Sequence, residues 1–135
     1  MVAGAASPAT LCRSSGTGSA AAIDALGCHA IGEGVLPLRA SPVPNTTGAF
    51  FYGASQAQTP FGNGTRCVGG VVYRLAYHQI VGGELTTELD YANPPQSGGQ
   101  ILAGSTWNFQ AYFRDPQGGG AQINLSDGLQ VTFVP

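Results

Sequence analysis

Polar and apolar side chains alternate with a period of two through the last third of the chain, and this pattern constrains the fold most. In an extended strand, successive side chains point to opposite faces. The segment Thr106–Arg114 therefore gathers its apolar side chains on one face, namely Trp107, Phe109, Ala111 and Phe113. Leu129–Phe133 repeats the alternation after a turn at Asn124–Gly128, and both segments are predicted to be half-buried strands.

Four earlier segments carry the same signal, and helical periodicity is almost absent. The further strands are expected at Gly34–Ala40, Gly48–Ser55, Val71–Ile80 and Glu84–Asp90. In Val71–Ile80, the pattern places Tyr73, Leu75 and Tyr77 on one face. The best helix candidate, Ser19–Leu26, is short and alanine-rich, and it fits a strand at a sheet edge equally well.

Turn residues separate these segments, as the loop Asp115–Gly120 illustrates with a proline and three glycines. Strands without crossover helices form antiparallel sheets, and a second sheet must cover the apolar face of the first. We therefore predict an all-β fold, an antiparallel β-sandwich of jelly-roll or immunoglobulin-like type with six to eight strands. At 135 residues the chain is one domain, with residues 1–18 an extended segment and residues 19–135 the sandwich.

Composition excludes several classes of protein. Charged residues make up 9% of the chain, and its only basic residues are five scattered arginines, too few for a nucleic-acid surface. The hydrophobic content of 43% argues against intrinsic disorder. No apolar run approaches the roughly 20 residues of a membrane span. Residues 1–11 lack a charged beginning, so we do not expect an intact signal peptide there.

No catalytic constellation is evident, and we predict that the protein is not an enzyme. The two histidines, His29 and His78, show no nucleophile or metal-ligand spacing with the cysteines. Glu84, Glu88 and Asp90 share the polar face of one predicted strand, which keeps a hydrolase with paired carboxylates open as a third option.

The sequence offers two candidate binding sites, and the residues of each also fit a simpler structural role. The polar face of Thr106–Arg114 offers a tyrosine as a sugar-stacking platform with amide and guanidinium neighbours, which makes a candidate ligand-binding set of Asn108, Gln110, Tyr112 and Arg114. The same side chains fit the outer face of an ordinary sheet. Asp115, Asn124 and Asp127 are weak calcium candidates, although aspartates before Pro and Gly are commonly turn formers. No other cofactor is expected.

The closing motifs carry a resemblance to a known family. The runs GSTWNFQAYFRDP (104–116) and NLSDGLQVTF (124–133) resemble the end of an uncharacterised β-rich domain found at the C-terminal ends of secreted bacterial proteins. The runs FFYG (50–53), PFGNG (60–64) and RCVGG (66–70) are similar to the middle of that family. The resemblance covers most of residues 19–135. It implies an exported domain with a disulfide between Cys12 and Cys67, and it leaves the state of Cys28 open.

Few charges and several long uncharged strands leave sheet edges little protected against pairing with neighbours. We therefore expect a secreted, non-enzymatic structural or adhesive module at the cell surface, which could be the self-assembling subunit of an extracellular filament. Its expected partners are further copies, neighbouring surface proteins or a polysaccharide. A carbohydrate-binding module is the alternative.

Overall fold

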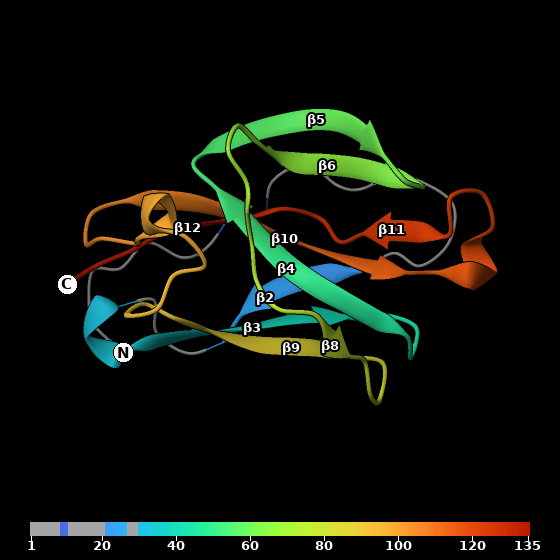
Figure 1. Cartoon of the computed structure of the whole chain (residues 1–135), viewed down its shortest axis with the longest axis horizontal. Helices are drawn as coiled ribbons and strands as arrows, with labels where there is room; N and C mark the ends of the chain where they lie inside the picture. The colour runs from blue at the N-terminus through green and yellow to red at the C-terminus, as the bar shows by residue number, and fades with distance from the viewer. Residues whose placement is uncertain (1–8, 11–20, 27–29) are drawn as a thin grey trace.

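The computed structural model describes residues 9–10, 21–26 and 30–135 and confirms the predicted all-β class. Its named strands pair antiparallel throughout and form sheets that pack on one another, as in a β-sandwich (Figure 1). In the described part of the chain, the helical elements are three short 3₁₀ turns at Ile31–Glu33, Ser97–Gly99 and Pro116–Gly118.

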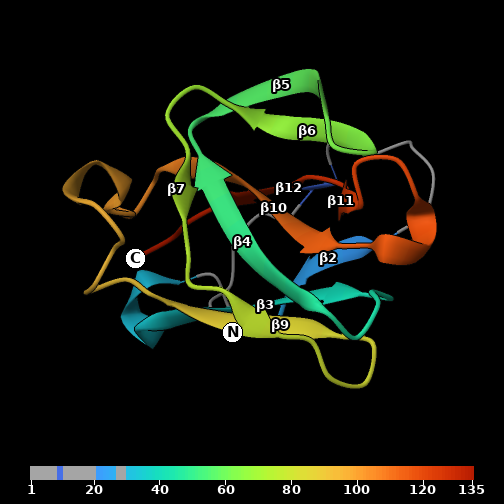
Figure 2. The same ribbon diagram turned by 45° about the vertical axis from the view of Figure 1, so that its right-hand side comes forward.

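The strands fall into three layers. The central sheet has the strand order β1 (Ala9–Thr10), β12 (Leu129–Thr132), β10 (Thr106–Arg114), β4 (Thr47–Gly53) and β7 (Tyr73–Arg74), with β11 (Ile123–Leu125) paired to β10 and β8 (His78–Gln79) paired to β4. The second sheet consists of β2 (Ala22–Ala25), β3 (Val35–Ser41) and β9 (Leu85–Asp90). A hairpin of β5 (Ser55–Phe61) and β6 (Gly64–Gly69) forms the third layer. Figure 2 shows the hairpin and the second sheet on opposite sides of the central sheet.

The described part of the chain has twelve strands, more than the predicted six to eight. The β5–β6 hairpin and the short strands β1 and β11 were not among the predicted strands, and Val71–Ile80 is broken into β7 and β8. The break resets the alternation, because Tyr73 and Leu75 pack against the core whereas Tyr77 is exposed. The prediction that these three side chains share one face is therefore wrong at Tyr77.

The main core lies between the central and second sheets. As predicted, the apolar face of β10 is buried there, and it meets Leu36 and Leu38 of β3 and Leu85 and Leu89 of β9. Tyr52 of β4 lies among aromatic rings, with centroid distances of 5.3 Å to Phe109, 5.4 Å to Trp107 and 5.5 Å to Tyr73. Its hydroxyl donates a 2.6 Å hydrogen bond to the Gly99 carbonyl, so the polar group of the largest fully buried side chain has a partner.

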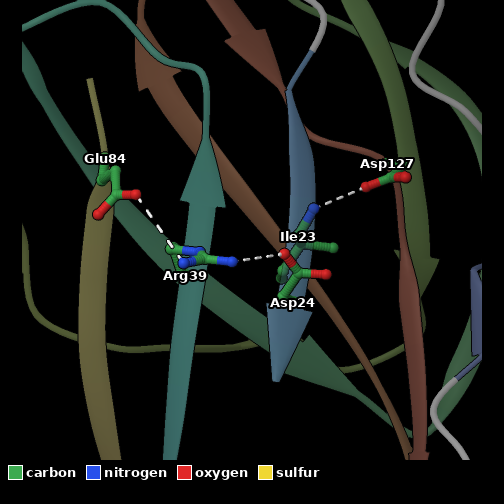
Figure 3. Close-up of polar contacts among 5 residues, drawn as sticks. All are labelled: Ile23, Asp24, Arg39, Glu84 and Asp127. Atoms are coloured by element: carbon green, nitrogen blue, oxygen red, sulfur yellow. Dashed lines mark hydrogen bonds and ion pairs between the residues drawn. The ribbon is translucent and has the colours of Figure 1, made fainter. Parts of the chain in front are cut away.

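β2 joins the two sheets through a buried carboxylate. The segment that fitted either a helix or an edge strand is the strand β2, which pairs with β3. The backbone N–H of Ile23 in β2 donates a 2.9 Å hydrogen bond to Asp127 Oδ1, and Asp127 precedes β12 of the central sheet (Figure 3). The Asp127 N–H in turn donates to the Ala21 carbonyl at 3.1 Å. Asp127 therefore connects the second sheet to the central one.

Of the predicted N-terminal extended segment, the described residues are Ala9 and Thr10, which pair with Gln130 and Leu129 as β1. Cys12 and Cys28 lie outside the described residues. The predicted Cys12–Cys67 disulfide therefore stays a prediction.

The hairpin is attached to the outer face of β10 by one amide side chain. Gln110 is fully buried, and its Oε1 accepts a 2.8 Å hydrogen bond from the Cys67 N–H of β6. Its Nε2 donates to the carbonyl oxygens of Thr65 at 2.9 Å and Ser126 at 2.6 Å. A small apolar cluster of Phe51, Val68 and Leu125 packs beside it. Gln110 thus satisfies three backbone groups, two in β6 and one at Ser126, that would otherwise be buried without partners.

We predict that Gln110→Ala lowers the free energy of unfolding by about 3 kcal/mol, because it leaves buried donors and acceptors unsatisfied. Urea unfolding followed by the fluorescence of Trp107 measures this loss. Gln58→Ala is the matched control, since Gln58 is an exposed glutamine of the same hairpin, and we expect a change within about 0.5 kcal/mol. Equal stability of the two variants would contradict the bridging role of Gln110.

Candidate functional site: a groove between the hairpin and the central sheet

The hairpin covers one part of the predicted ligand-binding face of β10 and leaves the other part accessible. Asn108 and Gln110 are buried, and the Asn108 amide donates a 3.2 Å hydrogen bond to the Gly53 carbonyl. Both side chains serve the packing of β10 and do not face solvent. The candidate surface is thereby reduced to Tyr112, which is half-buried, and Arg114, which is exposed.

Tyr112 belongs to a polar and aromatic cluster with two residues of the β7–β8 segment. Its hydroxyl donates a 2.6 Å hydrogen bond to the Tyr77 hydroxyl, and the two rings meet edge to face with centroids 5.8 Å apart. The Arg74 Nη1 donates to the Tyr77 hydroxyl at 3.2 Å and to the Tyr112 hydroxyl at 3.5 Å. The guanidinium also lies 4.9 Å from the centre of the Tyr77 ring, within cation–π range.

A groove opens beside this cluster, between the hairpin and the central sheet. It encloses a cavity of about 180 Å³ lined by Phe51, Phe61, Arg66, Val72, Arg74, Tyr112 and Leu125, and we call it the arginine groove. Apart from two guanidinium groups and one hydroxyl, its lining side chains are hydrocarbon. The Nε of Arg66 is buried without a hydrogen-bond partner. A second hollow, of about 250 Å³, is lined in part by Tyr77, Tyr112 and Arg114.

Three arginines on this side of the molecule carry charges that no carboxylate of the described residues compensates. Among the described residues, both ion pairs belong to Arg39, which contacts Asp24 at 3.3 Å and Glu84 at 3.9 Å (Figure 3). Arg66, Arg74 and Arg114 have no acidic partner within that part of the chain. This face of the molecule is therefore positively charged and partly apolar.

The electrostatics of the cluster keep Tyr112 neutral. Burial, together with the hydrogen bond to Tyr77, raises the pKa of Tyr112 to about 12. The pKa of Arg74 is raised as well, chiefly by its hydrogen bond to Tyr112. The groove thus presents fixed positive charges next to neutral aromatic rings at any physiological pH.

The opposite side of the molecule, the outer face of the second sheet, is acidic. Its charged side chains are Asp24, Arg39, Glu84, Glu88 and Asp90, four carboxylates against one guanidinium. The Asp90 carboxylate accepts hydrogen bonds from Asn93 Nδ2 at 2.8 Å and Ala92 N–H at 2.9 Å, and the Asn93 bond above all lowers its pKa. Asp90 is therefore an ionised carboxylate, whereas a general acid for glycoside cleavage needs a raised pKa.

The side chains of the three calcium candidates form hydrogen bonds with other groups of the protein. Asn124 Nδ2 donates to Asp115 Oδ2 at 3.3 Å in a buried pair, while Asp127 accepts from Ile23. Within the residues that the structure describes, no three His, Cys, Asp or Glu side chains form a metal-binding group. His78 Nε2 lies 3.0 Å from the Thr87 hydroxyl.

Arg66, Arg74, Tyr77 and Phe61 were not among the predicted site residues. The turn pair Gly62–Asn63 between two extended segments is a hairpin signal that would have placed Phe61 and Arg66 together. No sequence signal marks the break that turns Tyr77 outward.

No family model, curated protein or solved structure matches this chain. The resemblance to the C-terminal domains of secreted bacterial proteins accordingly stays a prediction. In the described ranges, no helix is long and apolar enough to cross a membrane.

We predict that the stability of the protein falls as the pH rises from about 10 to about 12, and that Tyr112→Phe makes this fall shallower. Tyr112 ionises at an ordinary pKa of 10.0 when the chain is unfolded but only near 12 when it is folded. In that window the unfolded chain loses the proton first, so a stabilising contribution present below pH 10 is lost. Thermal unfolding of both proteins across this pH range measures the difference. Identical curves would show that Tyr112 is not held neutral by the fold.

Proposed function

We propose that this chain is a secreted, non-enzymatic structural or adhesive module at the cell surface, which associates with neighbouring molecules through the arginine groove. The observation that carries the proposal is an apolar cavity bordered by two arginines that form no ion pair with the carboxylates the structure describes. A groove of this kind gains free energy when another molecule covers its hydrocarbon lining and supplies carboxylates.

Several features support attachment over catalysis. The groove contains no nucleophile with an adjacent base, and its tyrosine is neutral and already hydrogen-bonded. The acidic side chains of β9 lie on the opposite face of the molecule. The resemblance to domains of secreted bacterial proteins supports an extracellular location, where a Cys12–Cys67 disulfide would persist.

A carbohydrate-binding module is the second candidate, and one observation favours it. Tyr77 is exposed beside Tyr112 and Arg74, so its ring could stack on a sugar while the guanidinium binds a carboxylate or hydroxyl. The fully buried Asn108 and Gln110 contribute nothing to such a site.

Sedimentation of the purified full-length chain over a wide concentration range, with electron microscopy of the same samples, tests the proposal. We expect species larger than a monomer that grow with concentration and shrink at high salt, because salt screens the charges involved. A pull-down with neutral and acidic polysaccharides runs in parallel, using Tyr77→Ala as the variant. A chain that stays monomeric and binds saturably to a polysaccharide, with binding lost in Tyr77→Ala, would replace the proposal by the second candidate. A chain that stays monomeric and binds neither the neutral nor the acidic polysaccharides would overturn both the proposal and the second candidate.

A further inference from the structure

The turn between β8 and β9 carries an unusual combination of side chains. Val81 is 74% exposed, the most exposed of the large hydrophobic side chains in the described part. It forms a bridge with Glu84 across Gly82 and Gly83, whose φ angles of 66° and 75° suit glycine. A valine and a carboxylate therefore stand side by side on a tight turn, which projects from the molecule on the side away from the hairpin (Figures 1 and 2).

We propose that this turn, Val81–Glu84, docks into the arginine groove of a second copy of the chain. The inference rests on the proposed function and names its partner. The groove is complementary to the turn. It has a hydrocarbon-lined cavity for Val81, and it has the guanidinium groups of Arg66 and Arg74 for Glu84.

The sizes of the two features agree. Cavities of roughly 150 Å³ with apolar walls take up a group as large as benzene, and the groove encloses about 180 Å³. A single valine side chain on a narrow turn can enter such a space. Because most of the lining is hydrocarbon, the cavity suits an apolar side chain better than a sugar, whose hydroxyls would be left without partners.

Glu84 is available for a new partner. Its side chain is 49% exposed, and its contact with Arg39 is 3.9 Å, at the outer limit of an ion pair. Arg39 keeps the closer contact with Asp24 at 3.3 Å if Glu84 turns away. Glu88 and Asp90 add to the negative charge on this side and would steer it toward the arginines of another copy.

The positions of the two features determine the kind of assembly. The turn and the hairpin that borders the groove lie on opposite sides of the central sheet (Figure 2). A contact between them is heterologous, because each copy uses one surface to donate and another to accept. Such contacts repeat without saturating unless a ring closes, so they generate an open filament.

Two blocking variants test this inference in the full-length chain. Val81→Lys removes the apolar side chain and adds a charge that the arginines repel, but it leaves the groove intact. Arg74→Ala removes one charge of the groove but leaves the turn intact. We expect each variant alone to associate roughly tenfold or more weakly than the wild type. A mixture of the two should form dimers and nothing larger, since only one intact turn and one intact groove meet.

Leu102→Lys is the matched control, because Leu102 is 63% exposed and lies outside the arginine groove. It should assemble like the wild type, and circular dichroism should show all variants folded. A wild type that assembles while both blocking variants assemble equally well would overturn the inference and leave the proposed function standing. Blocking variants that are monomeric and form no dimer when mixed would also overturn it. A wild-type protein that is monomeric at every concentration would contradict the proposed self-association itself.

Discussion

The strand β10 is covered on both faces, and the rest of the structure depends on this double burial. Its apolar face closes the core of the sandwich, where Phe109 and Phe113 meet the second sheet. Its polar face lies beneath the hairpin, where Gln110 replaces water as the partner of three backbone groups. Burial of a polar strand face is tolerable only when its amides are satisfied. These hydrogen bonds, together with the apolar cluster of Phe51, Val68 and Leu125, position the hairpin, and its position creates the groove.

Charge is separated across these layers. The arginines that form no ion pair among the described residues, Arg66, Arg74 and Arg114, belong to the central sheet and the hairpin, whereas the exposed carboxylates cluster on the second sheet, with one further acid, Glu33, in a 3₁₀ turn. Charged residues make up only 9% of the chain, so most of the remaining surface is neutral and leaves this separation intact. The molecule therefore has one face with arginines and an opposite, acidic face. This favours contact between the arginine face of one copy and the acidic face of the next.

The sequence predicted those parts of the fold that follow from local alternation. The strands β3, β9, β10 and β12 lie where period-two patterns placed them, because one face of each is buried in the main core. What escaped prediction depends on distant contacts. Whether the polar face of β10 meets water or another layer is decided by the hairpin, whose Cys67 lies 43 residues before Gln110 in the chain. Likewise, Tyr77 leaves the face of Tyr73 because the chain changes its path between β7 and β8, and the alternation itself does not reveal this. The arginine groove was therefore only partly predictable, through Tyr112.

Amide hydrogen exchange measured residue by residue by NMR tests the double coverage of β10 most directly. The informative group is the backbone N–H of Cys67, which donates to the Gln110 side chain. If the hairpin is an integral layer, this amide exchanges as slowly as the amides at the centre of β10. An amide of Cys67 that exchanges as fast as those of the exposed turn between β8 and β9 would show that the hairpin does not cover β10 in solution.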